Sequence, residues 1–133
     1  MSCTSKFAFA ICVILALTEA SAAFETGARF IASCERLERG IKIRPDKTLQ
    51  LPLDQGAIIC WGYILALQEL SRLHESDPSV RMTQACPPPQ TTATQLLGIV
   101  IRHAKSNSHL LTAPAMALTL SALRSAFPCG TRT

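Results

Sequence analysis

The sequence contains none of the short motifs that mark common catalytic sites. It has no G-x-S-x-G nucleophile elbow, no H-E-x-x-H zinc motif, no glycine-rich phosphate loop and no paired-carboxylate motif. No two cysteines have C-x-x-C spacing, and His74, His103 and His109 are not close to any cysteine in the sequence, which argues against a Cys/His zinc site. Glu69 and Glu75 flank His74, but that spacing is common on any helix. We therefore expect no enzyme activity, no cofactor and no metal.

Charge is sparse as well. Charged residues make up 17% of the chain, and the formal net charge is +4. The lysines and arginines are scattered and form no run, so the basic tracts typical of nucleic-acid binding are absent. We expect no nucleic-acid partner. A mild positive balance suits a partner with an acidic surface.

No apolar stretch reaches the about 20 residues that a membrane-spanning helix needs. The apolar run 7–17 carries no charge and follows Lys6, and Ala20-Ser21-Ala22 fits a small-residue cleavage site. This order is typical of a secretory signal peptide. We predict a signal peptide over residues 1–22 and a single exported domain over residues 23–133, with no membrane attachment once the signal is removed. A retained N-terminal anchor is the alternative.

The predicted mature chain has four cysteines: Cys34, Cys60, Cys86 and Cys129. An even number in an exported chain indicates disulfides, and four cysteines allow three pairings. Cys86 precedes and Cys129 follows a predicted pair of helices joined by a short break, so an antiparallel arrangement would bring the two side by side. We predict the pairs Cys34–Cys60 and Cys86–Cys129, each stabilising the fold by about 3 to 4 kcal/mol through loop closure.

Hydrophobic periodicity predicts four helices. The first covers residues 26–39, with Thr26 as its cap, and the second covers residues 56–74. The third follows Thr92, which forms a capping box with Gln95, and the fourth covers residues 112–126. The segment 41–55 shows no periodicity and is predicted to be a loop without regular structure. The sequence thus predicts an all-α fold, a small four-helix bundle stapled by two disulfides.

The second helix is apolar on nearly all sides. We predict that its buried stripe consists of Ile59, Tyr63, Ala66, Leu70 and Leu73, with Ile58, Trp61 and Leu65 on another face. Gly62 in this helix suggests that another backbone passes close by. The fourth helix has two apolar stripes, one through Met116, Leu120, Leu123 and Phe127 and one through Ala115, Leu118 and Ala122. Because a small domain cannot easily bury all of these faces, we predict a symmetric homodimer through the second or the fourth helix.

Four segments together resemble one known family, the Rap/Tai-type immunity proteins. They are Cys60-Trp61-Gly62-Tyr63-Ile64, Ala85-Cys86-Pro87-Pro88, Thr92 with Gln95-Leu96, and Ala126-Phe127-Pro128-Cys129. These proteins are small exported antidotes to type VI secretion amidase effectors, and the resemblance covers nearly the whole mature chain. The chain differs from the family at Asn107-Ser108-His109, where members often have His-Pro-Glu. The resemblance implies an all-α periplasmic protein, often a homodimer, that occludes the active-site cleft of a peptidoglycan-cleaving amidase.

An inhibitor of a cleft enzyme needs an element that projects from its surface. The polar break between the third and fourth helices is short and held by both, so binding through it loses little entropy. We predict that it contacts the amidase through Lys105, Ser106, Asn107, Ser108 and His109. Asn107 and His109 would supply hydrogen bonds, and the apolar face around Trp61 is the second choice. A secreted helical carrier of a small apolar ligand is the alternative function.

Overall fold

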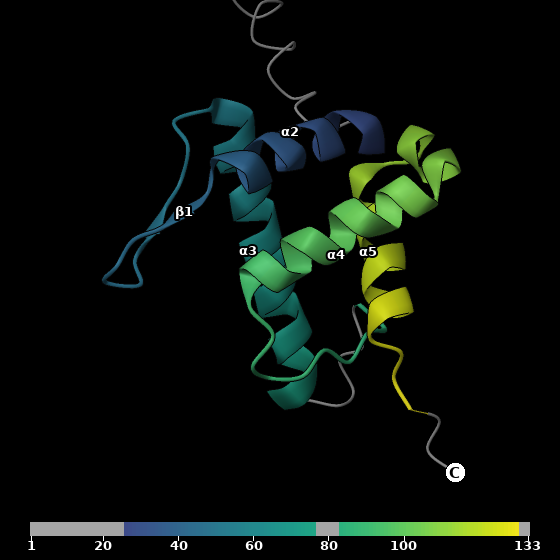
Figure 1. The fold of residues 1–133 in the computed structure, drawn as a ribbon. Coiled ribbons are helices and arrows are strands. Elements are labelled where there is room, and N and C mark those ends of the chain that lie inside the picture. Colours follow the sequence, from purple (N-terminus) through teal and green to yellow (C-terminus); the bar gives the residue numbers. More distant parts are fainter. Residues whose placement is uncertain (1–25, 77–82, 131–133) are drawn as a thin grey trace, which may run out of the picture.

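The computed structural model describes residues 26–76 and 83–130. The signal peptide predicted for residues 1–22 lies outside this range. The described chain forms helices α2 (Gly27–Gly40), α3 (Gln55–Ser76), α4 (Ala93–Ser106) and α5 (Ala115–Ala126), a short 3-10 helix η2 (Ser108–Thr112) and a two-stranded sheet. Figure 1 shows α4 lying across the front of α3 and α5, with α2 beside the upper end of α3. The predicted all-α bundle is confirmed.

Two helix starts follow the local sequence signals closely. The Thr26 hydroxyl accepts a hydrogen bond from the Arg29 amide at 3.5 Å and caps α2. At α4, the Gln95 amide donates to the Thr92 hydroxyl at 3.2 Å, and the Thr92 amide donates to the Gln95 side chain at 2.8 Å. This reciprocal pair is a complete capping box, which satisfies two amides that have no partner within the helix. Both predicted caps are therefore confirmed.

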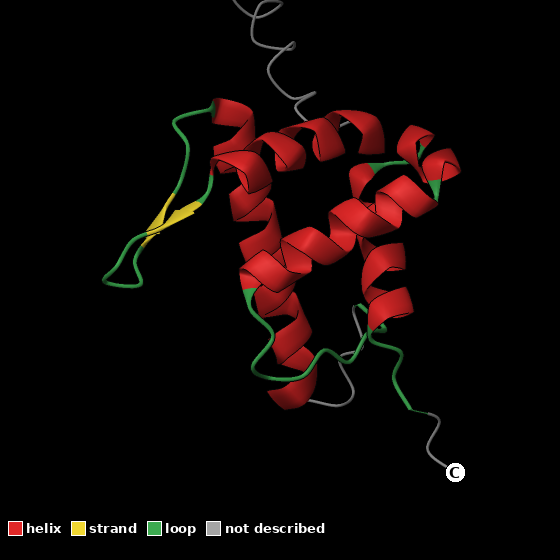
Figure 2. Ribbon diagram, in the orientation of Figure 1, coloured by secondary structure: helices red, strands yellow, loops and turns green. Residues whose placement is uncertain are grey.

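The segment between α2 and α3 is not a structureless loop, which corrects the prediction for residues 41–55. Strands β1 (Lys42–Ile43) and β2 (Leu49–Gln50) pair antiparallel, with Lys42 opposite Gln50 and Ile43 opposite Leu49. Figure 2 shows this hairpin extending away from the helices. The prediction failed because strands of two residues are too short to produce an alternating pattern in the sequence.

The connection between α4 and α5 also differs from the predicted short break. Helix α4 continues through Lys105 to Ser106, and the chain then forms η2 before α5 begins at Ala115. Pro114 occupies the N-cap position of α5, so it lies just before the helix and not in its first turn. A proline at this place leaves no helical hydrogen bond unmade, because the first amides of a helix have no partner within it.

The hydrophobic core lies between all four helices. The buried residues of α2 and α4 recur at helical spacing: Phe30, Ile31, Cys34 and Leu37, with Leu96, Leu97, Val100, Ile101 and Ala104. The stripe Ala115, Leu118 and Ala122 of α5 is also buried. In the other predicted stripe Leu123 is buried, Leu120 and Phe127 are half-buried, and Met116 is 44% exposed.

The buried face of α3 is not the predicted one. The buried positions are Ala57, Cys60, Ile64, Leu67 and Ser71, which recur at spacings of three and four residues. Of the predicted stripe, Tyr63 and Leu70 are half-buried, Ala66 is exposed, and Ile59 and Leu73 are 36% and 49% exposed. Apolar residues surround this helix, so their spacing alone does not distinguish the core face from the outer face.

Both predicted disulfides are present. Cys34–Cys60 joins α2 to α3 with its Cα atoms 5.4 Å apart, and Cys86–Cys129 joins the segment before α4 to the end of the chain with 5.0 Å between Cα atoms. The second bridge is reinforced by backbone pairing, because the Cys86 amide donates to the Phe127 carbonyl at 2.9 Å. The two bridges thus hold opposite parts of the bundle.

Candidate functional site

One side-chain cluster superficially resembles a catalytic triad. His103 Nε2 lies 3.0 Å from Ser121 Oγ, and Asn107 Nδ2 lies 3.5 Å from His103 Nδ1. The Asn107 amide nitrogen also donates to the His103 carbonyl at 2.9 Å, which fixes the orientation of the amide. The hydrogen bond between His103 and Ser121 connects α4 to α5, and its direction depends on the tautomer of the imidazole. The cluster is thus a polar link between these two helices.

The surface hollows do not resemble the closed pocket of a carrier protein. One hollow of about 260 Å³ is lined by Gln68, Ser71, Leu96 and the prolines after Cys86. Exposed Arg72, Pro88 and Pro89 border it, so it opens to solvent. A carrier of a small apolar ligand would need a cavity that encloses most of the ligand's surface. Within residues 26–76 and 83–130, no cluster of three histidines, cysteines or acidic residues could hold a metal ion.

The predicted contact residues lie together at the junction of α4 and η2. Ser106, Ser108 and His109 are exposed, and none of the residues in η2 is buried. The Lys105 ammonium is 3.3 Å from the Glu35 carboxylate, and its side chain is 62% exposed. Asn107 is different, because its amide nitrogen is engaged by His103. The hydrogen-bonding groups that this junction offers to a partner are therefore chiefly those of its serines and His109.

Trp61, the second predicted contact, is half-buried against the core. The outer face of α3 is more exposed and strongly apolar: Ile58 is 49%, Ile59 36% and Leu65 39% exposed, and Ala66 is also exposed. A Cβ atom added to Gly62 would meet nothing within 4 Å, so the close backbone expected there is absent from the described chain. We call Ile58, Ile59, Gly62, Leu65 and Ala66 the outer face of α3.

Tyr63 closes the space between α3 and α5. Its ring lies 4.7 Å from the Phe30 ring, centroid to centroid, and its hydroxyl donates to the Met116 sulfur at 3.4 Å. Burial raises the pKa of the Tyr63 hydroxyl, and a hydrogen bond with Thr119 opposes that rise. The half-buried tyrosine is thus a packing element between these helices.

The β-hairpin is the most exposed structured element, and sequence reasoning did not select it. All residues from Lys42 to Gln50 are exposed, and Ile43 is 73% exposed. Its turn is closed by the Asp46 carboxylate, which accepts from the Thr48 hydroxyl at 2.6 Å and from the Thr48 amide at 2.9 Å. These two bonds lower the pKa of Asp46. Two prolines obscured the hairpin in the sequence, because Pro45 in its turn and Pro52 after its second strand are typical of loops.

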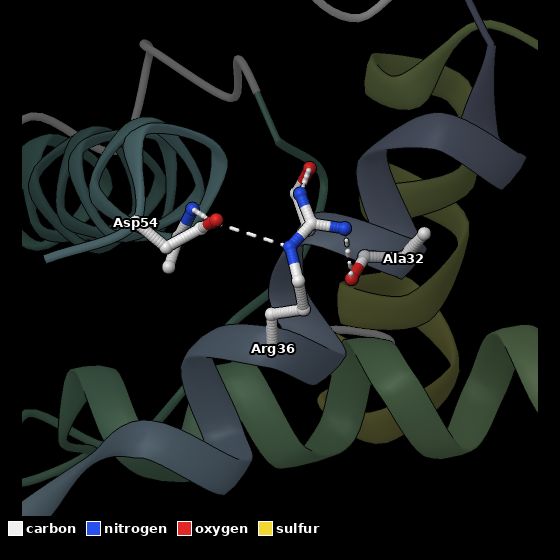
Figure 3. A network of polar contacts seen from close by, with 5 residues as sticks. Ala32, Arg36 and Asp54 are labelled. Atoms are coloured by element: carbon white, nitrogen blue, oxygen red, sulfur yellow. Dashed lines mark hydrogen bonds and ion pairs between the residues drawn. The ribbon is translucent and has the colours of Figure 1, made fainter. Parts of the chain in front are cut away.

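The base of the hairpin is held by a network around Arg36 (Figure 3). Arg36 Nε donates to Asp54 Oδ1 at 3.2 Å, while its terminal nitrogens donate to the Ala32 carbonyl and the Ser33 hydroxyl. Asp54 Oδ1 also accepts from the Ala57 amide at 2.8 Å and so caps α3. The Ala57 amide and then Arg36 lower the pKa of Asp54. One carboxylate therefore connects the end of the hairpin to both neighbouring helices.

A comparison with protein-family models matches residues 26–129 to the Rap1a immunity proteins. The chain belongs to the Rap1a immunity protein family. Comparisons with curated proteins and with solved structures gave no match. The family match spans all four described helices and both disulfides, so it covers the hairpin and the α4–η2 junction alike.

Membership of the Rap1a immunity protein family suggests an immunity function against a secreted effector, and implies that the chain binds a cognate effector. Such proteins typically act by binding and not by catalysis. Among the helices that the structure describes, none combines the length and the apolarity needed to cross a membrane. A Rap1a chain of this kind must present a surface to its effector, and the exposed features above are the candidates.

Proposed function

We propose that the protein is a periplasmic immunity protein that binds and inhibits a peptidoglycan-cleaving amidase effector of a type VI secretion system. The match of residues 26–129 to the Rap1a immunity proteins carries this proposal. The two disulfides support the location, since disulfides persist in oxidising compartments such as the periplasm. The signal peptide predicted for residues 1–22 would deliver the chain there.

Inhibition would occur by occlusion of the amidase cleft. The α4–η2 junction supports this mechanism because Ser106, Ser108 and His109 are exposed on a short segment held by α4 on one side and by η2 on the other. A segment held in this way loses little conformational entropy on binding. Lys105 and Asn107 would contribute by keeping the junction in shape through Glu35 and His103. Trp61 remains the second candidate contact.

The proposal is tested by protection against the effector. Amidase effectors of type VI secretion systems would be exported one at a time to the periplasm of a susceptible bacterium, with and without this protein. We expect lysis without the protein and growth with it. A matched version lacking residues 1–22 should stay in the cytoplasm and give no protection. Lysis in the presence of the exported, folded protein would contradict the immunity function.

We also propose that the protein is a symmetric homodimer formed through the outer face of α3. In an antiparallel crossing at Gly62, Ile58 would lie opposite Ala66 of the partner subunit, and Ile59 would lie opposite Leu65 of the partner subunit. Each of these side chains would then pack against an apolar side chain. The open space at Gly62 permits close approach of the two helices. Apolar side chains exposed side by side on one helix are typical of such contacts.

The dimer is tested by light scattering at micromolar concentration. We expect twice the mass of one chain for the wild type and the mass of one chain for Leu65→Asp, because a carboxylate would be buried without a partner. Leu73→Asp is the matched control, since Leu73 is 49% exposed on the same helix but lies 11 residues beyond Gly62, about 16 Å along the axis from the proposed crossing. A monomer mass for the wild type would rule the dimer out.

A further inference from the structure

The apolar face of the β-hairpin continues the core beyond the bundle. Ile41 and Leu51, at its base, are partly buried against the core. Ile43 in β1 and Leu49 in β2 lie opposite each other, and they are 73% and 37% exposed. Because directly opposed residues of an antiparallel pair lie on the same face, Ile43 and Leu49 form an apolar surface, two residues beyond Ile41 and Leu51, that extends outward from the described core. Leu53, just beyond, is fully exposed, at 101%.

The same hairpin carries an excess of positive charge. Lys42, Arg44 and Lys47 are all exposed, and none of them forms an ion pair in the part of the chain that the structure describes. The only carboxylate between them, Asp46, is directed to the Thr48 amide and hydroxyl. Cations on exposed side chains attract an acidic surface and speed its association. The hairpin therefore combines apolar side chains with an unbalanced cationic charge.

The hairpin is also held firmly, although a two-stranded hairpin alone is only marginally stable in water. The Cys34–Cys60 bridge joins the helices on its two sides, and Asp54 is bonded to Arg36. At the first strand's start, a Cβ on Gly40 would lie only 2.7 Å from the Pro52 ring, so the two ends of the hairpin are packed together. Such an element would enter a cleft with little loss of conformational entropy.

We propose that the hairpin, residues 41–53, docks into an apolar groove with an acidic rim on the secreted effector. This inference rests on the proposed immunity function. The hairpin lies at the C-terminal end of α2, whereas the α4–η2 junction lies at its N-terminal end, where Gly27 packs against the Leu110 and Ala113 carbonyls. The 14 residues of α2 span about 20 Å, and an interface of ordinary size is wide enough to reach both ends.

The test measures binding of the effector against which the protein protects, purified and made catalytically inactive, to the full mature protein. Two hairpin variants are compared: Ile43→Asp, and the triple reversal Lys42→Glu, Arg44→Glu and Lys47→Glu. Leu73→Asp and the double reversal Arg72→Glu with Arg102→Glu are controls, because they make the same kinds of change at exposed positions of α3 and α4. Asn107→Ala with His109→Ala reports on the junction. Thermal melting checks that every variant is folded.

We expect Ile43→Asp to weaken binding about tenfold or more, the range of an interface hot spot. The triple reversal should slow association and abolish its dependence on salt, while both controls stay within about twofold of the wild type. Hairpin variants that bind the effector as tightly as the wild type would overturn the inference. It would also be overturned if Ile43→Asp, measured without effector, lost self-association, because the hairpin would then contact a second copy of the chain. If the wild type itself does not bind, the immunity function fails and the hairpin inference fails with it.

Discussion

Two helical glycines of this chain have opposite surroundings. A Cβ atom on Gly27 would lie 2.8 Å from a Leu118 methyl and 2.9 Å from the Leu110 carbonyl oxygen. The Gly27 amide also donates a hydrogen bond to the Ala113 carbonyl at 2.7 Å. This bond holds the backbone at Gly27 and the backbone at Ala113 in place. Gly62, in the middle of α3, has no atom of the described chain within 4 Å of the same position. Gly27 is thus required by packing, and Gly62 is not required by the fold of one chain.

The two alanine substitutions should therefore have opposite effects on stability. Gly27→Ala should lower the free energy of unfolding by about 1 to 3 kcal/mol, because the methyl group overpacks a rigid backbone contact. Gly62→Ala should raise the stability of the monomeric chain by up to about 1 kcal/mol, the difference in helix propensity. Urea denaturation of both variants in the Leu65→Asp background separates folding from dimerisation. A destabilised Gly62→Ala monomer would contradict this account.

At the scale of single elements, the start of α3 depends on Asp54. Its carboxylate accepts from the Ala57 amide and from Arg36, and both bonds favour the ionised form and lower its pKa below the usual 3.8. A group whose folded pKa is lowered contributes stability above its unfolded pKa and loses it as the pH falls through the folded value. The contribution of Asp54 is therefore present at neutral pH and disappears below about pH 4.

Substitution of Asp54 should separate its two roles. Asn remains a good N-cap but cannot form the ion pair, whereas Ala can do neither. We expect the melting temperature at pH 7 to fall in the order wild type, Asp54→Asn, Asp54→Ala. As the pH falls below about 4, the wild type should lose its advantage over Asp54→Asn. Equal melting temperatures of all three proteins at pH 7 would show that the cap and the ion pair are not stabilising.

Comparison of α4 with α3 explains which elements were predictable. The capping box of Thr92 and Gln95 at the start of α4 is a local signal, and it was predicted correctly from the sequence. In α3, apolar residues such as Ile59 and Leu65 lie outside the buried stripe, so only the position of neighbouring helices determines the face that is buried. The hairpin at Lys42–Gln50 was missed for a similar reason. Its strands are short, and their pairing depends on contacts between distant residues, such as the disulfide between Cys34 and Cys60.

For the molecule as a whole, the two disulfides differ in burial. Cys34 and Cys60 are both 0% exposed, whereas Cys86 and Cys129 are only half-buried. Loop closure alone predicts greater stabilisation by the Cys86–Cys129 bridge. Its separation of 43 residues corresponds to about 4 kcal/mol, whereas the separation of 26 residues for Cys34–Cys60 corresponds to about 3.5 kcal/mol. Burial reverses this order, since removing two sulfur atoms from the core also leaves a cavity.

We therefore expect Cys34→Ala with Cys60→Ala to destabilise the protein more than Cys86→Ala with Cys129→Ala. Urea denaturation of both double variants measures the difference. A variant that lacks both disulfides should be unfolded, because the combined loss approaches the free energy of unfolding of an ordinary domain, about 5 to 15 kcal/mol. Greater destabilisation by the Cys86–Cys129 deletion would show that loop length outweighs packing here.

The Cys34–Cys60 bridge also makes residues 34–60 a covalent ring with the hairpin turn at its far side. A protease that cuts after exposed Lys47 would leave two fragments joined through this ring, and the helices would stay in place. For the same reason, residues between Arg44 and Thr48 can be exchanged or inserted without disturbing the core. The hairpin turn can therefore vary without a change in the bundle, which would allow an immunity protein to adapt this surface to a changing effector.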